Sequence, residues 1–477
     1  MTPLPPYPAY KDSGVPWLGR IPAHWDATMT KRHYSIQLGK MLQNTPKSND
    51  DKSIPYLKAQ HVQWFAVRSH GLPHMWASPV EIEGYGVQVG DLLVCEGGEG
   101  GRSGLVKSIG GPAIIQNALH RVRPSSFCRN DFLQYVMSTV SAIGWFDALN
   151  NKATIAHFTY EKFGALGIPI PPPHEQRAIT RYLDHVDRRI RRTIRARQKL
   201  IALLEEQKQA VIHLAVTGQI DVRTGRPYPV YKPSGVEWLG EVPEHWDTRP
   251  AKYFFREVDE RSLTGEEELL SVSHITGVTP RNQKTITMFM AASYVGHKRC
   301  QPGDLVINTM WAWMGALGIA EQTGLVSPSY GVYRPLHSST LLPEYADCLL
   351  RTKPFVDEYI CRSTGIRSSR LRLYPEQFLR IHVVCPSAEE QRSILDQIAT
   401  GTGYLNAAID RTQREIALLR EYRTRLIADV VTGQVDVRAA AAQLPAEVEE
   451  TDALVEEEVF GDEEGEEQPD VEKEADA

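Results

Sequence analysis

The chain reads YKDSGVPWLG at residues 10–19, and 221 residues later it reads YKPSGVEWLG at residues 231–240. The likeness continues with four more residues, which return at the same offset: Pro22, His24, Trp25 and Asp26 as Pro243, His245, Trp246 and Asp247. We call these two segments the opening motifs. Because a repeat of this kind means that one structural unit is present twice, the two halves of the chain are expected to share an architecture.

Three shorter strings are also doubled. Gly90-Asp91-Leu92 returns at an offset of 213, whereas Glu175-Gln176-Arg177 and Thr217-Gly218-Gln219 both return at 215. The first part of each copy has therefore gained or lost residues, but from Glu175 onward the two copies keep the same length. A long helix packed along another helix explains this constancy, because one inserted residue would rotate the remainder by about 100°.

Apolar residues in these constant-length segments recur at spacings of mostly three, four and seven, as a coiled-coil seam requires. The first segment has Leu183, Ile190, Ile194, Ile201, Leu204 and Val211, which align with Ile398, Leu405, Ile409, Ile416, Leu419 and Leu426. Proline precedes each segment and glycine follows it, as is typical of helix ends. The sequence predicts two helical arms, residues 178–216 and 393–431, with polar Arg197 and Thr412 interrupting the seam.

The order of the segments predicts how the arms pack. If residues 223–385 form one globule, the second arm begins near the point where the first arm ended, so the arms run antiparallel. We expect an α+β protein in which two mixed α/β domains are separated by a long antiparallel two-helix coiled coil, a dumbbell with pseudo-two-fold symmetry. The expected segments are an opening motif (1–25), a first variable domain (26–173), a central arm (174–222), a second variable domain with the repeated motif (223–385), a distal arm (386–438) and a tail (439–477).

The variable domains read as strand-rich. Strand-like strings such as Leu92–Cys95 and Leu305–Ile307 are separated by turns with Gly and Pro. Each domain has one helical stretch, near Asp131–Val140 and Pro343–Tyr359 respectively.

Composition and charge narrow the class of protein. Apolar residues make up 42% of the 477 residues and charged residues 23%, so the chain can bury large cores. Residues 447–476 hold 16 acidic residues and one lysine, a local charge of −15, which leaves +9 on the rest of a chain whose net charge is −6. A polyanionic partner suits that basic body. The tail is expected to be a disordered, solubilising extension, or alternatively to fold back onto the basic body.

Membrane and metal sites are not expected. No stretch approaches the ~18 uninterrupted apolar residues of a membrane span, and the first residues lack the features of a signal peptide, so we expect a cytoplasmic protein. The six cysteines form no CxxC pair. His70 and His74 bracket Gly71 and Pro73, so they cannot share a helix face as metal ligands.

The doubled YK-x-SGV-x-WLG-x-x-P-x-HW, E-Q-R and V-T-G-Q-[IV]-D-V-R strings, in this order around two divergent segments, resemble the specificity subunit of a Type I restriction-modification system. The resemblance covers Tyr10 to Arg438 and implies that each variable domain is a target-recognition domain for one half of a split sequence in double-stranded DNA. It also implies that the arms set the spacer and dock two methyltransferase subunits. Cleavage would belong to motor/nuclease subunits, and S-adenosylmethionine, ATP and Mg²⁺ only to these partners.

Missing motifs agree with a chain that has no catalytic residues of its own. There is no N-P-P-[FY] or D-P-P-[FY] tetrad and no G-x-x-x-x-G-K-[ST] loop. Two alternatives remain: a self-sufficient DNA methyltransferase or nuclease, and a helical scaffold that binds only protein.

Side chains that can address base edges lie in turn-rich strings of each variable domain. The candidates for DNA binding in the first are Arg102, Asn117, His120, Arg121, Lys152 and Thr154, from GGEGGRSG, QNALHR and NNKATIAH. Those in the second are Asn308, Trp311, Trp313, Arg367, Ser369 and Arg370, from NTMWAWMG and GIRSSRLR. The alternatives are that the glycine-rich run is a plain hairpin loop, that the two tryptophans are core residues, and that Arg121 pairs with a carboxylate on the surface.

A basic run lies on the first arm and has no equal on the second. From it we select Arg191 and Arg195 as candidates for contact with phosphates of the spacer DNA; the alternative is a solvated helix face. The four tryptophans of the opening motifs are expected to pack the variable domains against the arms, or else to contact a methyltransferase subunit.

Overall fold

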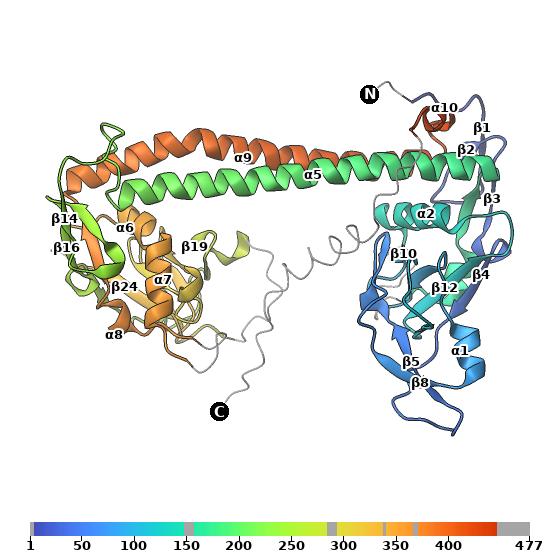
Figure 1. The fold of residues 1–477 in the computed structure, drawn as a ribbon, viewed down its shortest axis with the longest axis horizontal. Helices are drawn as coiled ribbons and strands as arrows, with labels where there is room; N and C mark the ends of the chain where they lie inside the picture. Colours follow the sequence, from blue (N-terminus) through green and yellow to red (C-terminus); the bar gives the residue numbers. More distant parts are fainter. Residues whose placement is uncertain (1–3, 147–156, 284–292, 337–339, 366–370, 446–477) are drawn as a thin grey trace. The chain divides into compact units, whose positions relative to one another are not determined.

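The computed structural model describes residues 4–146, 157–283, 293–336, 340–365 and 371–445 (Figure 1). The chain divides into two compact units. Unit 1 comprises residues 1–196 and 415–477, and unit 2 comprises residues 197–414. Two long helices, α5 (Pro173–Val216) and α9 (Ala388–Val431), run from one unit into the other and are each 44 residues long.

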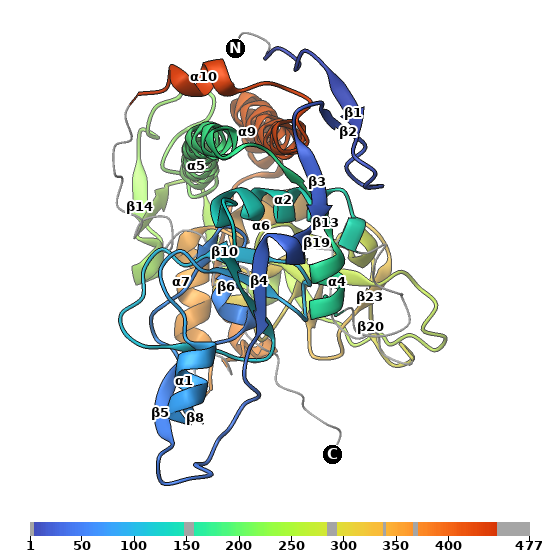
Figure 2. The same ribbon diagram turned by 90° about the vertical axis from the view of Figure 1, so that its right-hand side faces the viewer.

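The arms are antiparallel, as the order of the segments predicts, and Figure 2 shows α5 and α9 end-on and next to each other. In unit 1, Arg423 of α9 forms an ion pair with Asp187 of α5. In unit 2, Val211 of α5 lies against Gly401 of α9, where an added Cβ would be 3.6 Å from Val211 Cγ1. From the first pair to the second the residue number increases in α5 and decreases in α9, as an antiparallel pair requires. Both helices begin five residues before the predicted arms, because the Glu-Gln-Arg string forms part of the first turns.

The buried positions of α9 follow a heptad pattern. Leu405, Ile409 and Ile416 are at most 7% exposed, and Thr402 and Thr412 are buried in the same row. Both threonines donate their hydroxyl to a carbonyl of their own helix, at 2.7 Å. Polar seam positions are thus satisfied within α9. The remaining predicted seam residues are buried at Leu183, Ile190, Ile398 and Leu426 and half-buried at Ile194, Ile201, Leu204, Val211 and Leu419.

The first variable domain is built on an antiparallel sheet in the order β10-β9-β12-β4. Helix α2 (Asn130–Ala142) packs on this sheet, and most of its residues are buried. The sheet strands are β4 (Tyr34–Leu38), β9 (Leu92–Cys95), β10 (Ser103–Leu105) and β12 (Leu119–Pro124). Smaller elements are β5 (Lys52–Leu57), β6 (Val62–Gln63), β7 (Ala66–Val67), β8 (His74–Ala77), α1 (Pro79–Tyr85), β11 (Ile114–Ile115) and α4 (Tyr160–Ala165).

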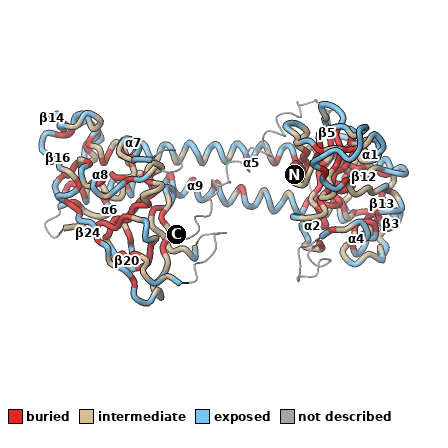
Figure 3. The backbone as a smooth tube through the Cα atoms, turned by 90° about the horizontal axis from the view of Figure 1, so that it is seen from below, coloured by how far each residue is buried: buried red, intermediate tan, exposed pale blue. Residues whose placement is uncertain are grey.

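The second variable domain repeats this sheet in the order β22-β21-β24-β17. Its strands are β17 (Phe255–Glu257), β21 (Leu305–Ile307), β22 (Leu317–Ile319) and β24 (Gly331–Pro335). Around it lie β18 (Leu270–Ser273), β19 (Gly277–Pro280), β20 (Lys298–Cys300), β23 (Gly324–Val326) and α8 (Pro375–Phe378). The cores of both domains are buried, whereas much of α5 and α9 is exposed (Figure 3).

Each variable domain is closed by pairing between its first and last strands. Strand β3 (Asp26–Met29) pairs with β13 (Gly167–Ile170), and β16 (Asp247–Pro250) pairs with β25 (His382–Cys385). Each domain therefore leaves and re-enters the arms at one place.

The helix expected over Pro343–Tyr359 is instead two helices. Helix α6 (Pro343–Leu350) ends before Thr352, and α7 spans Lys353–Arg362. Pro354 lies in the first turn of α7, where its missing N–H is tolerated, and a continuous helix would place it in the interior.

The opening motifs join the helix ends at two equivalent junctions. In junction 1 the carboxylate of Glu175, which is 1% exposed, accepts hydrogen bonds from Tyr7 Oη (3.1 Å) and Trp25 Nε1 (2.8 Å). His24 Nε2 lies 2.6 Å from Glu175, and Arg438, just past the end of α9, lies 3.4 Å from it. A carboxylate at a helix start also faces the positive end of the helix dipole.

Junction 2 repeats the tyrosine and histidine contacts. Glu390 accepts a hydrogen bond from Tyr228 Oη (2.7 Å), and His245 Nε2 lies 2.9 Å away. Trp246 is fully buried like Trp25, but its Nε1 has no hydrogen-bond partner among the described residues. The two strands of each opening motif pair with each other: β1 (Tyr10–Asp12) with β2 (Arg20–Pro22), and β14 (Tyr231–Pro233) with β15 (Glu241–Pro243).

The glycines after the two arms are required for contact as well as conformation. Gly218 and Gly433 have φ angles of 76° and 73°. A Cβ on Gly433 would lie 2.4 Å from Pro22 Cδ, and one on Gly218 would lie 2.5 Å from Pro243 Cδ. Any other residue would therefore push the opening motif away from the end of the helix.

The chain closes on itself in unit 1. The backbone N–H of Asp436 donates to the Pro5 carbonyl at 2.7 Å, and Tyr10 Oη donates to the Gln434 carbonyl at 3.1 Å. The short helix α10 (Arg438–Ala442) follows. Segments near both ends of the described chain are thus fixed to one junction.

The remaining doubled strings also have structural roles. Gln176 Oε1 accepts from the backbone N–H of Arg129 (3.1 Å), just before α2, and Gln391 Oε1 accepts from that of Leu342 (2.8 Å), just before α6. The Asp of each Gly-Asp-Leu is 1% exposed and binds an arginine of the neighbouring strand. These ion pairs are Asp91 with Arg123 and Asp304 with Arg334.

Candidate nucleic-acid interface

Three strings that are distant in sequence meet at the end of strand β9. The backbone N–H of Glu96 donates to the Ala118 carbonyl at 2.9 Å, and that of Phe158 donates to the Glu96 carbonyl at 2.7 Å. These bonds bring together the glycine-rich loop, the turn before β12 and the segment that leads into α4. We call residues 96–102, 116–118 and 157–158 loop cluster 1.

The second variable domain has the same arrangement. Thr309 Oγ1 donates to the Ser329 carbonyl at 2.8 Å, and the backbone N–H of Leu373 donates to the Thr309 carbonyl at 3.0 Å. We call residues 309–315, 327–330 and 371–373 loop cluster 2. The loop after the central strand is the hub in both domains, although the residues of the two loops differ.

Two predicted candidates of the first variable domain, Arg102 and Arg121, are bound to the protein itself. Arg102 donates to the Ala59 carbonyl (3.2 Å) and lies 3.4 Å from Glu99, and its side chain is 17% exposed. Arg121 donates to the Gly86 carbonyl. Neither guanidinium is directed freely at solvent. The backbone of the glycine-rich loop forms the turn of the β9–β10 hairpin, as its composition predicts.

His120 is fully buried, with Nε2 2.9 Å from the Phe158 carbonyl. Burial lowers the pKa of His120, so the ring is neutral at pH 7 and Nε2 can donate this bond. It therefore fixes the segment entering α4. Asn117 is half-buried in the turn of cluster 1, and Lys152 and Thr154 lie outside the described residues.

In cluster 2, Asn308 is 6% exposed and donates to Tyr330 Oη at 3.0 Å, so it also supports the loop. Trp311 and Trp313 are half-buried, with rings stacked at 5.9 Å and an interplanar angle of 17°. A partly exposed aromatic pair at a loop tip can contact a base or sugar. Arg367, Ser369 and Arg370 lie outside the described residues.

The two candidates on α5 differ in their surroundings. Arg191 forms an ion pair with Asp187 at 2.8 Å and is half-buried, whereas Arg195 is exposed. Arg188, Arg189 and Arg192 of the same run are also exposed.

The structure adds residues that the sequence reasoning missed. Gln60 is exposed and follows Ala59, whose carbonyl binds Arg102 of cluster 1. Ser329 is exposed and supplies the carbonyl that holds Thr309. The turn SPSY, residues 327–330, resembles the other polar strings and could have indicated Ser329. No local sequence pattern indicates Gln60. Its segment is brought to cluster 1 by the bond between Ala59 and Arg102, which are more than 40 residues apart.

The tryptophans of the opening motifs connect the variable domains with the arms. Trp17 Nε1 donates to the Gly167 carbonyl of β13 at 2.8 Å, and Trp238 packs edge-on against Phe355 of α7 at 5.0 Å. Trp25 and Trp246 are buried at the helix ends. Such contacts are expected if the tryptophans pack the variable domains against the arms.

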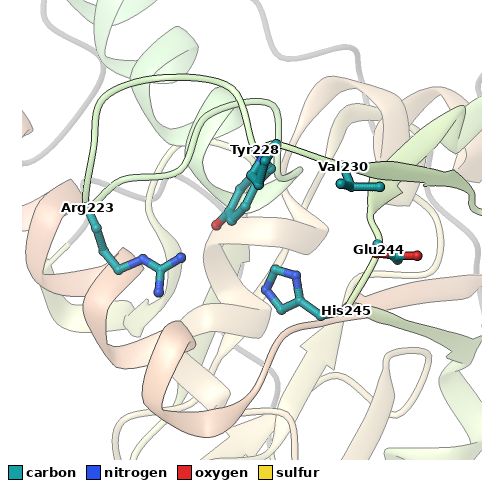
Figure 4. A pocket seen from close by; sticks show the side chains of 6 residues that line it. Arg223, Tyr228, Val230, Glu244 and His245 are labelled. Atoms are coloured by element: carbon teal, nitrogen blue, oxygen red, sulfur yellow. The ribbon is translucent and has the colours of Figure 1, made fainter.

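A pocket of about 240 Å³ lies at junction 2 and not at a loop cluster (Figure 4). Its lining residues are Arg223, Tyr228, Pro229, Val230, Glu244 and His245. Burial and the carboxylate of Glu390 raise the pKa of Tyr228, so its hydroxyl stays protonated and keeps its bond to Glu390. The pocket is therefore part of the junction.

The described residues contain no candidate metal centre and no candidate membrane span. There is no group of three or more His, Cys, Asp or Glu side chains arranged to hold a metal ion in that part of the chain. None of the helices there combines the length and apolar character needed to cross a membrane.

Comparisons with known proteins agree with this architecture. A family model described as a Type I restriction modification DNA specificity domain matches residues 79–201. No curated protein sequence matches the chain. A chain from a structural study of complex assembly and conformational transition in a type I R-M system has a TM-score of 0.60 and 14% identity, with 87% of this chain and 99% of that chain covered.

Two further structures are similar over comparable lengths. The HsdS subunit from Thermoanaerobacter tengcongensis is 16% identical with a TM-score of 0.42, covering 87% of this chain and 98% of its own. The S subunit from M. genitalium is 14% identical with a TM-score of 0.32, covering 86% and 96%.

The family match lies in the first variable domain and the start of α5, and the fold is shared over most of the chain. The doubled strings that carry the resemblance form the two junctions and the strand-to-helix contacts of both units. Residues 79–201 are thus similar to the Type I restriction modification DNA specificity domain, and most of the chain shares its fold with a chain from a type I R-M system.

Proposed function

We propose that each variable domain is a target-recognition domain that reads one half of a bipartite sequence in double-stranded DNA. The observation that carries this proposal is the pair of loop clusters. The same three-segment arrangement is built twice on the same strand order, but different side chains occupy it. Duplicated geometry with divergent residues fits two sites that perform one task on two different sequences.

The candidate residues fall into two groups: those that support the loops and those that we propose to contact DNA. Arg102, His120, Arg121 and Asn308 bind groups of the protein and so fix the loop backbones. We propose that base contacts come from less buried or undescribed positions. These are Asn117, Lys152 and Thr154 with Gln60 in the first domain, and Trp311, Trp313, Arg367, Ser369 and Arg370 with Ser329 in the second.

We propose that Arg195, together with its exposed neighbours on α5, contacts DNA phosphates over the spacer. Arg191 is a weaker candidate because Asp187 already neutralises it. Phosphate contacts carry no sequence information, so replacing Arg195 should flatten the salt dependence of binding and leave the preferred sequence unchanged.

Assembly and location complete the proposal. Specificity subunits of this family are non-catalytic and bind no cofactor themselves. The arms and opening motifs are proposed to dock two methyltransferase subunits, which supply S-adenosylmethionine chemistry, and the full complex to include motor/nuclease subunits that use ATP and Mg²⁺. The proposed location is the cytoplasm, where the DNA is. The proposed domain limits are 26–173 for the first variable domain and 223–385 for the second with its repeated opening motif.

The test is the methylated motif of a cell that expresses this chain with its methyltransferase subunits. A motif of two short specific halves around an unread spacer is expected. Trp311→Ala should change or relax one half only, and Asn117→Ala should affect the other half only. A continuous motif, or one variant altering both halves equally, would contradict the proposal.

The two alternatives are tested with the purified chain. Binding to DNA of random sequence at a stated salt concentration separates the proposal from a scaffold that binds only protein. Methylation or cleavage by the chain without partner subunits would instead support a self-sufficient enzyme.

A further inference from the structure

A strained turn in the first variable domain lies between loop cluster 1 and the arms. Strands β6 and β7 form a hairpin whose two-residue turn is Trp64–Phe65. Phe65 has a φ of 69°, and it is the one non-glycine residue with positive φ in the part of the chain that the structure describes. An aromatic residue is strained in this conformation, so other contacts must hold it there.

Those contacts come from both arms and from α2. The ring of Phe65 packs against Tyr135 of α2 with centroids 5.0 Å apart. The guanidinium carbons of Arg191 and Arg423 lie 5.8 Å and 5.4 Å from the centre of the Phe65 ring. Arg191 belongs to α5 and Arg423 to α9. Phe65 is 9% exposed, so these cation–π contacts are largely shielded from water.

One carboxylate fixes both arginines. Asp187 of α5 binds Arg191 at 2.8 Å and also binds Arg423 Nε. One turn earlier, Asp184 accepts a hydrogen bond of 2.6 Å from Tyr135 Oη. We call Phe65, Tyr135, Asp187, Arg191 and Arg423 the latch. The turn of the hairpin is thus held at the point where the ion pair of Asp187 and Arg423 joins the two arms.

The neighbouring residue faces the other way. Trp64 Nε1 donates to Glu99 Oε1 at 2.7 Å, in the glycine-rich loop of cluster 1. The backbone N–H of Phe65 also donates to the Ser103 carbonyl at 3.1 Å, directly after that loop. Two adjacent residues therefore connect loop cluster 1 with both arms.

The corresponding hairpin of unit 2 is held in a different way. The hairpin β18–β19 packs on β22, as β6–β7 packs on β10, but Ile275 at its tip is 74% exposed. Arg351 of unit 2 donates to the carbonyls of His274 and Ile275 at 3.0 Å and 2.8 Å. The tip is thus tied to the end of α6. The arm positions aligned with Asp187 and Arg191 are Thr402 and Asn406.

We propose that Phe65 is a positioning residue that fixes the angle of the first target-recognition domain on the arms and thereby restricts the length of the unread spacer. The inference rests on the proposed function. A domain that can rock on its arms can place its half-site contacts one base pair nearer or farther. The latch removes this freedom in the first domain, whereas Arg351 ties the hairpin tip of the second domain to that domain itself.

The test compares three variants, each expressed with the methyltransferase subunits, by sequencing methylated genomic DNA. Phe65→Gly removes the ring and suits a positive φ, so the hairpin should stay folded. We expect it to keep both half-sites and to raise methylation at sites with a spacer one base pair longer or shorter by roughly tenfold relative to the normal spacer. Phe65→Tyr keeps the ring and should restore the wild-type ratio. Ile275→Ala, the matched change in the second domain, should leave the ratio unchanged.

The possible outcomes separate the latch from the proposed function. An unchanged spacer ratio in Phe65→Gly overturns the latch. A uniform loss of methylation at all spacers also overturns it, because it shows a role in stability only; Phe65→Asn, which tolerates the same φ, repeats this measurement independently. A wild-type motif without two halves overturns the proposed function instead, whatever the variants do.

Discussion

Trp25 and Trp246 occupy equivalent, fully buried positions, yet only Trp25 has a hydrogen-bond acceptor among the described residues. Trp25 Nε1 donates to the charged carboxylate of Glu175. A hydrogen bond to a charged group contributes about 1.5–3 kcal/mol, whereas an unpaired buried donor contributes nothing favourable. A comparison of the two tryptophans therefore separates the free energy contributed by one hydrogen bond from the free energy contributed by burying an indole ring.

Replacing each tryptophan by phenylalanine should reveal this difference. Both Trp25→Phe and Trp246→Phe remove similar apolar volume, but only Trp25→Phe removes a bond to a buried carboxylate. We expect Trp25→Phe to lower the local free energy of opening by about 1.5–3 kcal/mol more than Trp246→Phe does. Hydrogen exchange of peptides covering the first turns of α5 and α9 measures both; equal losses would contradict the assignment.

His61 gives the molecule a pH-dependent element next to the latch. It is 3% exposed, and its Nδ1 accepts the backbone N–H of Lys58 at 3.1 Å. Burial, and then the charges of Lys58 and Arg68, lower the pKa of His61 from 6.5 to about 4. Protons therefore bind the unfolded chain more readily than the folded one.

Stability from His61 should be complete above pH 6.5 and should be lost as the pH falls towards 4. One pKa unit corresponds to about 1.4 kcal/mol, so the loss approaches roughly 3 kcal/mol. Urea denaturation of the wild type and of His61→Asn at pH 7 and pH 5 measures it. The Asn side chain keeps an acceptor for Lys58 but does not titrate, so the variant should lose less stability between the two pH values. Parallel losses would refute the role of His61.

At the scale of elements, the arms depend on a thin seam. Leu405, Ile409 and Ile416 are buried, although neither variable domain covers this part of the helices with a second layer. The buried hydroxyl of Thr412 donates to the Ala408 carbonyl of its own helix. Apolar side chains, and not the threonines, should therefore hold the arms together.

Ile409→Ala should destabilise the arms by about 2–5 kcal/mol, because it removes buried methylenes and leaves a cavity. Thr412→Val, one helical turn away, has nearly the same shape and should be neutral or slightly stabilising, since the lost bond lies within one helix. Thermal unfolding followed by circular dichroism at 222 nm measures both. A larger loss for Thr412→Val would show that its hydroxyl has a partner across the seam.

The sequence predicts the arms well and the loop clusters poorly, for a physical reason. The seam is periodic and each arm is bounded by proline and glycine, so local rules suffice for the antiparallel pair and for strands such as β9. The break between α6 and α7 was missed although Pro354 signals it. The bonds of Arg102 to Ala59 and of His120 to Phe158 join residues about 40 positions apart, and no local pattern reveals such contacts.

At the scale of the whole molecule, arm length should set the spacer of the recognised DNA. Inserting seven residues in each arm, beside Arg197 and Thr412, preserves the heptad seam and adds about 10 Å, or about three base pairs at 3.4 Å each. Both half-sites should remain unchanged, and methylome sequencing should show the longer spacer. A seven-residue insertion in one arm only is the control, and it should abolish methylation because the seam loses its match. An unchanged spacer in the double insertion would contradict this role of the arms.

The closure of the chain at junction 1 has a practical consequence for handling the protein. Pro5 and Asp436 are hydrogen-bonded, and α5 and α9 share a buried core in each unit. A protease cut in a loop of either variable domain would therefore leave two fragments that still co-purify, and only denaturing electrophoresis would reveal the nick.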